Sequence, residues 1–483
     1  MSVLMRYEQL PRAGRSLLSI TALALTLSAC ATFSKDGGMS PVSGRVRDEI
    51  NLDTVKIVSP ADEVALTARV QGLLANPLTA DTAVQVALLN NRGLQAEFNK
   101  LGVSEADYVA ASLPESPIVS IGKLVNGADF EIERRLVGSL LSLFTLPARQ
   151  SIAETEFAAA ELRAVEATFT LAAETRRAFY KAVAAKQVVA QLEKARQAAD
   201  AAAELTIKLG ETGAATTLEQ ARASAFYAEV SNQLAEARLE QQLEREALTR
   251  LLGLWGPEIA FKLPGQLPAA PENLMPQDSL EALAMSKRVD LAAMRLELEA
   301  TAKSLGLTKA TRFVTILDLA GLSNTTGSNE TGETETEFGA ELELQIPLFD
   351  LGESSARRSA ETYMMAVNEL TEQAINARSE VRAAYVRYRA TYDISWQYRN
   401  RILPLRATID EQAALEYSGM LTDIFDLLTT TAESVDSNVA AIDAKRNFFL
   451  ASVDLQAAII GGGAGAETGA GDAPSGPAAA EEH

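Results

Sequence analysis

The chain has 483 residues and a formal net charge of −20, from 64 acidic and 44 basic side chains. This charge disfavours nucleic acid as a partner, because binding phosphate requires clustered lysine and arginine. The single cysteine, Cys30, cannot form an intramolecular disulfide, and the single histidine, His483, is the last residue. The usual imidazole bases and metal ligands are therefore missing, so we expect no cofactor and no metal site. A glycosidase-type carboxylate pair remains an alternative, since no spacing identifies one.

The first 30 residues have the order of a bacterial lipoprotein signal. Arginines at positions 6, 12 and 15 precede an apolar run over 17–27, which leads into Leu27-Ser28-Ala29-Cys30. The run is shorter than the about 20 residues that span a bilayer, and a small-residue cleavage site follows it. Leu27 to Cys30 resembles a lipobox, which implies a signal peptide over 1–29 and a lipid on the Cys30 sulfur. The alternative is an ordinary secretory peptide with an incidental cysteine. Because Ala31 replaces the aspartate that tends to retain lipoproteins at the inner membrane, we expect an outer-membrane location.

One sequence pattern occurs twice in the chain. Four pairs of segments match in the same order: 81–87 with 278–284, 177–180 with 382–385, Gly210 and Leu218 with Gly419 and Leu427, and 251–253 with 459–461. We therefore expect a first structural repeat over 81–253 and a second over 278–460, joined by a proline-rich linker over 254–277. Each repeat is expected to contain a short helix, two strands and two long helices.

Long stretches free of helix breakers predict the long helices. Residues 148–209 and 214–252 contain neither glycine nor proline, 353–418 is broken only by Pro404, and 420–460 has neither breaker. Alanine, glutamate, arginine, leucine and glutamine dominate 148–209, and these residues favour helix strongly. We expect long helices at about 148–252 and about 353–460. A coiled coil alone would explain them, so a structural periplasmic coiled-coil lipoprotein without channel activity is an alternative.

The strands argue against that alternative. From Glu337 to Ile346, polar or small residues alternate with apolar ones, which places the two sets on opposite faces of a strand. Such a strand, apolar outside and acidic inside, suits a water-filled transmembrane barrel. We expect strands at about 118–144 and about 313–346, with an exposed loop over 324–337. In the first strand pair, Glu131, Glu133 and Arg135 are expected to face one side. Arg134 interrupts the alternation there.

Four strands cannot close a barrel in a membrane, because unpaired backbone groups in hydrocarbon cost several kcal/mol each. The protomer is therefore expected to oligomerise.

The order of strands and helices over about 80–461 resembles the TolC-like outer-membrane factors. The most specific stretch looks like that family's strand-to-helix turn and contains Pro347, Leu348, Phe349, Asp350 and Gly352. Proline ends strand pairing there, and glycine permits a tight exit into the helix. The resemblance implies a mainly α fold with a membrane β-barrel portion: a homotrimer with a 12-strand barrel, continued by a periplasmic α-helical barrel.

The same resemblance implies a function. Such proteins are exit ducts of tripartite efflux or secretion systems and are not enzymes. They work with a periplasmic adaptor protein and an inner-membrane transporter, sit in outer-membrane lipid, and export drugs, metals or polypeptides.

Two segments resemble the helix tips with which that family contacts the adaptor. The candidate residues are Leu209, Gly210, Glu211, Thr212, Gly213, Ser418, Gly419, Met420 and Leu421. Each segment places glycine between two long helices, where a chain reversal needs a permissive residue. The simpler interpretation is a pair of helix-hairpin turns that contact no partner.

Asp423 and Asp426 follow the second tip and resemble the family's periplasmic gate. Three symmetry copies of a carboxylate at a constriction would attract cations and repel anions, because a narrow mouth focuses the potential. The alternative is that Asp426 is a solvated residue on a helix face. The remaining segments are an extension over 30–80, after the lipidated cysteine, and a tail over 461–483 whose composition predicts disorder.

Overall fold

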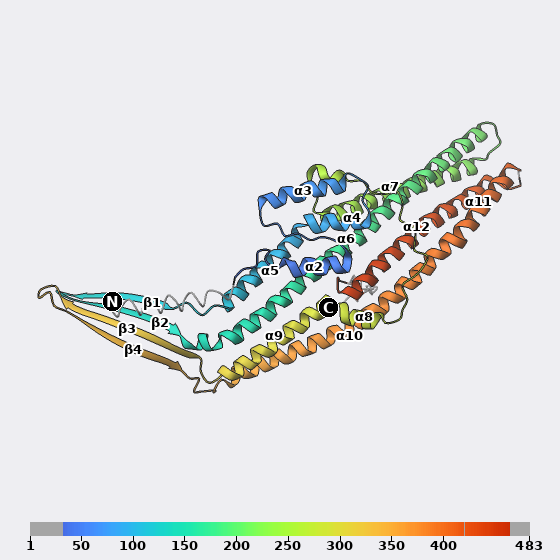
Figure 1. Ribbon diagram of the computed structural model, residues 1–483. Coiled ribbons are helices and arrows are strands. Elements are labelled where there is room, and N and C mark those ends of the chain that lie inside the picture. Colours follow the sequence, from blue (N-terminus) through green and yellow to red (C-terminus); the bar gives the residue numbers. More distant parts are fainter. Residues whose placement is uncertain (1–31, 420, 464–483) are drawn as a thin grey trace, which may run out of the picture. The chain divides into compact units, whose positions relative to one another are not determined.

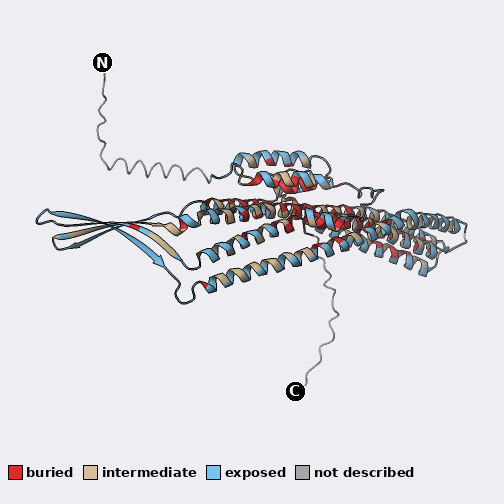
Figure 2. Ribbon diagram, turned by 60° about the horizontal axis from the view of Figure 1, so that its bottom comes forward, coloured by how far each residue is buried: buried red, intermediate tan, exposed pale blue. Residues whose placement is uncertain are grey.

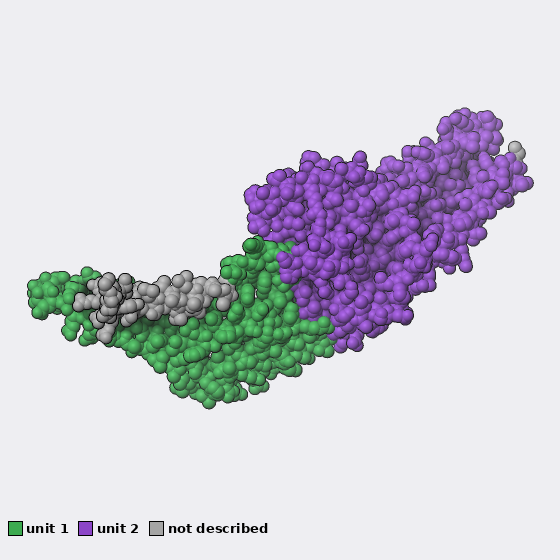
Figure 3. Space-filling model, viewed as in Figure 1, with its two compact units in different colours: residues 1–39, 99–161, 293–371 green, residues 40–98, 162–292, 372–483 purple. Residues whose placement is uncertain are grey.

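The structure is a computed structural model that describes residues 32–419 and 421–463. It is mostly helical, with one four-stranded antiparallel sheet (Figure 1). The chain forms two compact units, which Figure 3 colours separately. Unit 1 contains 99–161, 293–371 and the described residues up to Met39. Unit 2 contains 40–98, 162–292 and the described residues from 372 onward.

The sheet of unit 1 consists of two hairpins. Its strands are β1 (Ile118–Asn126), β2 (Asp129–Ser139), β3 (Ile316–Ser328) and β4 (Thr334–Gln345). They are ordered β1-β2-β3-β4, and each is antiparallel to its neighbour. Gly127, with a φ of 62°, supplies the left-handed backbone that a tight hairpin turn requires. Within the described residues, β1 and β4 are the two edges of this sheet and pair on one side only.

The prediction of an exposed loop over 324–337 is wrong for most of this segment. Thr325 pairs with Thr336 and Gly327 with Thr334, so only 329–333 connects the strands. The reason is the threonine content, since β-branched side chains favour strands even in a polar segment. The Thr325 and Thr336 hydroxyls, 3.2 Å apart, also hydrogen-bond across the pair.

The first strand pair is shorter than expected, because helix α6 (Leu140–Glu211) begins directly after Ser139. Pro147 lies inside α6 and removes one ladder hydrogen bond. Side chains satisfy carbonyls nearby: Thr145 Oγ1 donates to Leu141 O at 2.8 Å and Arg149 Nη2 to Ser142 O at 3.3 Å. These hydrogen bonds support the helix beside the proline, although neither reaches the Leu143 carbonyl, which is the acceptor that loses the N–H of position 147.

The other long helices are α7 (Thr217–Leu252), α10 (Glu353–Gln397), α11 (Leu403–Ser418) and α12 (Ile424–Ile460). A π-helical turn, Tyr398–Ile402, separates α10 from α11. It lies just before Pro404, which has no N–H to donate to the carbonyl four residues earlier in a regular α-helix. Helix α12 begins at Ile424 rather than at 420, because Asp423 has extended backbone angles and caps the helix.

The shorter helices are α2 (Met39–Ile50), α3 (Pro60–Leu74), α4 (Ala80–Asn90), α5 (Arg92–Ala111), α8 (Leu280–Lys287), α9 (Val289–Thr311) and a 3-10 turn, Gly256–Ala260. That turn belongs to the 254–277 segment, which is part of unit 2 and packs there against α6 and α12. Gln187 Oε1 accepts from Leu267 N at 3.1 Å, and Lys445 Nζ donates to Leu267 O at 3.0 Å.

Burial is concentrated in unit 2, as the red residues of Figure 2 show. One cluster joins α6, α7 and α12 through small and branched side chains, including Ala199, Ala203, Ala223, Val230 and Leu428. Alanine at these positions lets the helices approach closely. By contrast, every residue of β1 and β4 is exposed, so no part of the chain that the structure describes covers the outer strands of the sheet.

Candidate functional site

The sheet separates its charges by face. Residues paired across antiparallel strands point to the same side, so the register assigns each side chain to a face. One face, which we call the acidic face, carries all the carboxylates of the four strands: Asp129, Glu131, Glu133, Asp318, Glu335, Glu337, Glu341 and Glu343. The alternation seen in β4 therefore extends across the whole sheet.

Arg135 is the basic residue of the acidic face. Its Nη2 lies 3.2 Å from Glu341 Oε2 and 3.9 Å from Glu343 Oε2, although these glutamates lie two strands away on β4. On the same face, Asn324 Nδ2 donates to Glu131 Oε1 at 2.5 Å. These contacts leave most of the carboxylates unpaired by arginine, so the face stays strongly negative and hydrated.

The opposite face, which we call the apolar face, is mainly hydrophobic and largely exposed. Val119 is 67% exposed, Leu342 62% and Phe338 84%. The described strands place no carboxylate on it. An exposed apolar surface of this kind marks an interface with protein or lipid.

The strand-to-helix turn after β4 is built as the sequence predicts. Asp350 Oδ1 accepts from Gly352 N at 3.0 Å, and Asp350 Oδ2 accepts from Ser354 Oγ at 2.5 Å. These hydrogen bonds, with that from Ser354 the stronger cause, lower the pKa of Asp350. Gly352 has a φ of 72°, and a Cβ there would lie 2.2 Å from the Arg312 carbonyl oxygen. Pro347, Leu348 and Phe349 lead into the turn, and the latter two are exposed.

The first helix tip reverses the chain between α6 and α7. Leu209, Gly210 and Glu211 form the end of α6, and Thr212 and Gly213 lie in the turn. Leu209 O accepts from Ala214 N at 2.8 Å, and Gly213 has a φ of 75°, so this glycine supplies the permissive backbone.

The second tip reverses the chain between α11 and α12. Ser418 ends α11, and Leu421 N donates to Glu416 O at 2.9 Å. Gly419 has a φ of −81°, which any residue can adopt, so a permissive residue is not required there. Met420 lies outside the described residues.

The structure brings the two tips together at one end of unit 2 (Figure 1). The Arg222 guanidinium of α7 lies 4.1 Å from the centre of the Phe425 ring of α12. Ile424 and Leu428 belong to the cluster that also contains Phe226. A partner that contacts one tip would therefore meet the other.

Asp423 and Asp426 are both exposed, but they have different local roles. Asp423 Oδ1 accepts from Asp426 N at 3.0 Å and so caps α12. Asp426 Oδ2 accepts from Thr422 Oγ1 at 2.7 Å. Of the two, only Asp426 can be changed without removing the helix cap.

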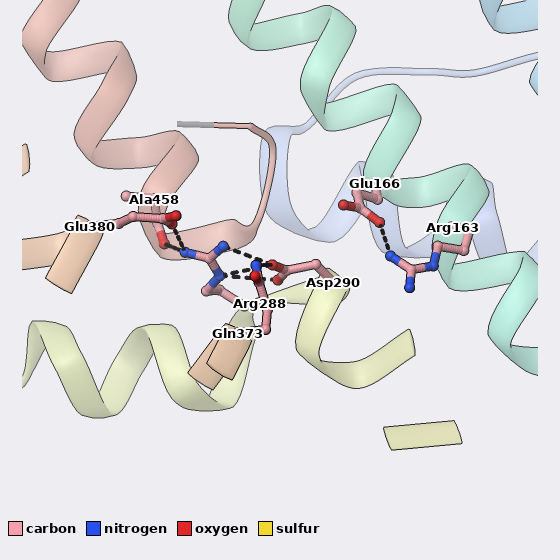
Figure 4. A network of polar contacts seen from close by, with 7 residues as sticks. All are labelled: Arg163, Glu166, Arg288, Asp290, Gln373, Glu380 and Ala458. Atoms are coloured by element: carbon pink, nitrogen blue, oxygen red, sulfur yellow. Dashed lines mark hydrogen bonds and ion pairs between the residues drawn. The ribbon is translucent and has the colours of Figure 1, made fainter. Parts of the chain in front are cut away.

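Sequence reasoning missed a buried ion network in unit 2, shown in Figure 4. Arg288 and Asp290, each 5% exposed, pair through Nη2 and Oδ2 at 2.7 Å. Arg288 Nη1 also lies 2.6 Å from Glu380 Oε2 and donates to Ala458 O at 3.3 Å, while Gln373 Nε2 donates to Asp290 Oδ2 at 2.8 Å. The network joins the start of α9 to α10 and α12.

A cavity of about 340 Å³ lies in unit 2 between α6, α10, α12 and the 254–277 segment. Tyr392, Trp396 and Lys445 contribute to its wall. Burial and the positive charge of Arg399 lower the pKa of Lys445. No sequence pattern indicates this cavity, because its wall comes from distant segments.

Two further findings bound the chemistry. No group of His, Cys, Asp or Glu in the described ranges is arranged to hold a metal ion. Among the helices that the structure describes, none offers the uninterrupted apolar length needed to cross a bilayer. Cys30, the expected lipidation site, lies outside the described residues.

No protein-family model and no curated protein matches the sequence. Solved structures, however, match its fold. The CmeC outer membrane channel of Campylobacter jejuni is 19% identical, with a TM-score of 0.68 over 79% of this chain and 86% of that chain. The outer membrane protein VceC of Vibrio cholerae is 16% identical, with a TM-score of 0.66 over 81% and 96%. The open state of the Neisseria gonorrhoeae MtrE outer membrane channel is 16% identical, with a TM-score of 0.64 over 82% and 89%.

The chain therefore has the fold of outer-membrane channels. This likeness confirms, at the level of the fold, the resemblance to the TolC-like outer-membrane factors.

Proposed function

We propose that this chain is one protomer of an outer-membrane exit duct and not an enzyme. Three copies form a homotrimer whose strands close one 12-stranded barrel, continued by a periplasmic α-helical barrel built from both repeats. The duct passively conducts substrates that an inner-membrane transporter and a periplasmic adaptor deliver. A lipid on Cys30 adds a second attachment to the outer membrane.

The sheet is the observation that carries this proposal. It is exposed on both faces, acidic on one, apolar on the other, and open at both edges. A single sheet of this kind in lipid would leave the backbone groups of β1 and β4 unpaired, at several kcal/mol each. If β1 of one copy pairs with β4 of the next, three copies leave no edge. The acidic face then lines water and the apolar face meets lipid.

Reconstitution of the full chain tests the proposal. We expect a detergent-solubilised trimer by native mass spectrometry and discrete conductance steps in planar bilayers. Leu342→Arg places a charge on the apolar face of each protomer and should abolish insertion, because an arginine there costs about 2–4 kcal/mol near the bilayer centre. Glu343→Gln, its neighbour on the acidic face, is the matched control and should insert normally. Two results together would instead support the coiled-coil lipoprotein. The wild-type protein would not conduct, and a Cys30→Ser variant would be monomeric without detergent.

The two helix tips are the proposed adaptor contacts. Leu421 is an apolar residue at the second tip, and it is 81% exposed, so no segment of the described chain covers it. Leu421→Asp should reduce co-purification of the adaptor and the inner-membrane transporter. Leu405→Asp is the control, since Leu405 is also exposed but lies near the start of α11, away from the tip. Equal loss of co-purification in both variants would contradict a contact at the tip.

A further inference from the structure

The apolar face carries two basic side chains and no carboxylate within the described strands. Lys123 of β1 pairs in register with Ile132, and Arg134 of β2 pairs with Ile121, so both point to the apolar face. Their positions are diagonal neighbours on adjacent strands, a spacing of roughly 7–8 Å that long side chains can bridge. Both residues are exposed. A charge on a lipid-facing surface is costly near the bilayer centre, so its position along the strands matters.

Hydroxyl groups extend this polar patch from Arg134 toward β4. Arg134 Nη1 donates to Thr325 Oγ1 at 3.0 Å, and Thr325 Oγ1 lies 3.2 Å from Thr336 Oγ1. The Lys123 ammonium lies 5.7 Å from the centre of the Phe130 ring. These contacts hold both cations at the surface but neutralise neither of them. We call Lys123, Arg134, Thr325 and Thr336 the cationic patch.

The cationic patch lies toward the hairpin turns, beyond a band of large apolar side chains. Between the patch and the helical end of the sheet, the apolar face carries Val119, Leu136, Leu317, Leu319, Leu342 and Leu344; Ile121 and Phe338 lie level with Arg134, and Val125 and Phe130 lie on the turn side of the patch. At about 3.3 Å per residue, the stretch from Leu344 to Thr336, which is level with Lys123, covers about 26 Å along the strand, or about 20 Å of height at a strand tilt of about 40°. This approaches the about 25 Å apolar height of outer-membrane barrels, so the patch falls at the outer edge of the hydrocarbon.

We propose that the cationic patch binds the phosphate groups of a phosphorylated lipid in the outer leaflet. This inference rests on the proposed function, because it requires the apolar face to meet lipid. Guanidinium and ammonium groups bind phosphate strongly through charge-assisted hydrogen bonds, and the two hydroxyls can donate further ones. The carboxylates of the described strands cannot compete, since they point to the acidic face.

A neighbouring protomer cannot neutralise the patch either. In the proposed trimer, β1 carries Lys123 next to β4 of another copy. On the apolar face, β4 presents Thr334, Thr336, Phe338, Ala340, Leu342 and Leu344, and none of these is acidic. Lipid phosphate is the anion left within reach.

The test compares a double variant with a matched control in the full-length trimer. Lys123→Gln with Arg134→Gln removes both charges of the patch, and Arg135→Gln removes a charge next to them on the acidic face. Binding of diphosphoryl lipid A to the detergent-solubilised trimers is measured by native mass spectrometry. We expect the double variant to bind at least about tenfold more weakly than wild type, the scale of one lost charge-assisted contact, with Arg135→Gln unchanged.

Two further arms separate the outcomes. Inorganic phosphate at millimolar concentration should not displace the lipid, because the free ion lacks the acyl chains that seat on the apolar band; displacement would show a site for free phosphate instead. Equal lipid binding by wild type and the double variant, in trimers that still conduct, overturns this inference alone. Wild-type protein that neither trimerises nor conducts overturns the proposed function and this inference together.

Discussion

Arg288 and Asp290 are only two residues apart, and their side chains form a doubly hydrogen-bonded ion pair that is almost fully buried. Arg288 Nε donates to Asp290 Oδ1 at 3.0 Å, and Arg288 Nη2 donates to Asp290 Oδ2 at 2.7 Å. Although burial opposes the charged form, the Arg288 guanidinium and the Gln373 amide lower the pKa of Asp290. The pair therefore stays ionised at neutral pH and ties the start of α9 to α10 and α12.

Arg288→Met should strongly destabilise unit 2. The substitution leaves Asp290 buried without its cation, and breaking a buried pair in this way costs about 3–5 kcal/mol. Urea denaturation followed by circular dichroism measures the loss. Arg163→Met is the matched control, because the Arg163–Glu166 pair in Figure 4 is partly exposed and such pairs contribute about 0–1 kcal/mol. Similar midpoints for the two variants would show that Arg288 does not hold these helices together.

Gly352→Ala should disrupt the strand-to-helix turn. The left-handed backbone alone costs an alanine about 1–2 kcal/mol, and its methyl group would collide with the Arg312 carbonyl oxygen. Thermal unfolding and trimer yield are the measurements. Gly306→Ala, inside α9 where a Cβ meets nothing within 4 Å, should be neutral or stabilising by up to about 1 kcal/mol. Equal melting temperatures and trimer yields for Gly352→Ala and Gly306→Ala would contradict this geometry.

Glu161 should make the stability of unit 1 depend on pH. Burial first, and then the negative charges of Asp36 and Glu105, raise the pKa of Glu161 to about 7, from an ordinary value of 4.5. Because the folded-state pKa is the higher one, the stabilising contribution is complete below about pH 4.5 and is lost as the pH rises through about 7. The Glu161→Gln side chain cannot ionise, so this variant should not lose stability over that pH range.

Melting temperatures of wild type, Glu161→Gln and Glu156→Gln from pH 4 to 8 check the effect. The Glu161→Gln curve should be flatter than wild type between about pH 4.5 and 7. Glu156 lies on the same helix but is exposed, so its variant should run parallel to wild type. Three parallel curves would show that Glu161 does not titrate in this range.

Local signals made part of this structure predictable from sequence. The turn from Pro347 to Gly352 is encoded in consecutive residues, since Asp350 bonds to Gly352 and Ser354. The alternation of β4 likewise identified an acidic and an apolar face before the register was known. Arg134 interrupted the expected alternation in the first hairpin, and the register explains why: it belongs to the apolar face, opposite Arg135.

Features that depend on distant contacts were not predictable. Arg288 donates hydrogen bonds to Glu380 and to the Ala458 carbonyl, which are 92 and 170 residues away in the sequence. No spacing in the sequence indicates these contacts. The polar composition of 324–337 suggested a loop, but pairing with neighbouring strands made most of it sheet. The stretch without helix breakers suggested a helix start at 148, whereas α6 begins at Leu140 and continues through Pro147.

Asp426→Ala should alter ion conduction without unfolding α12. In the proposed trimer, three copies of this carboxylate lie near the closed end, where a narrow mouth focuses their potential and favours cations. Removing them should raise single-channel conductance and reduce cation preference in planar bilayers. Asp423→Ala is unsuitable as the test, because losing the α12 cap costs about 1 kcal/mol by itself. Asp436→Ala changes an exposed carboxylate further along α12 and is the better control. If Asp426→Ala and Asp436→Ala conduct alike, Asp426 is a solvated surface residue and the gate must lie elsewhere.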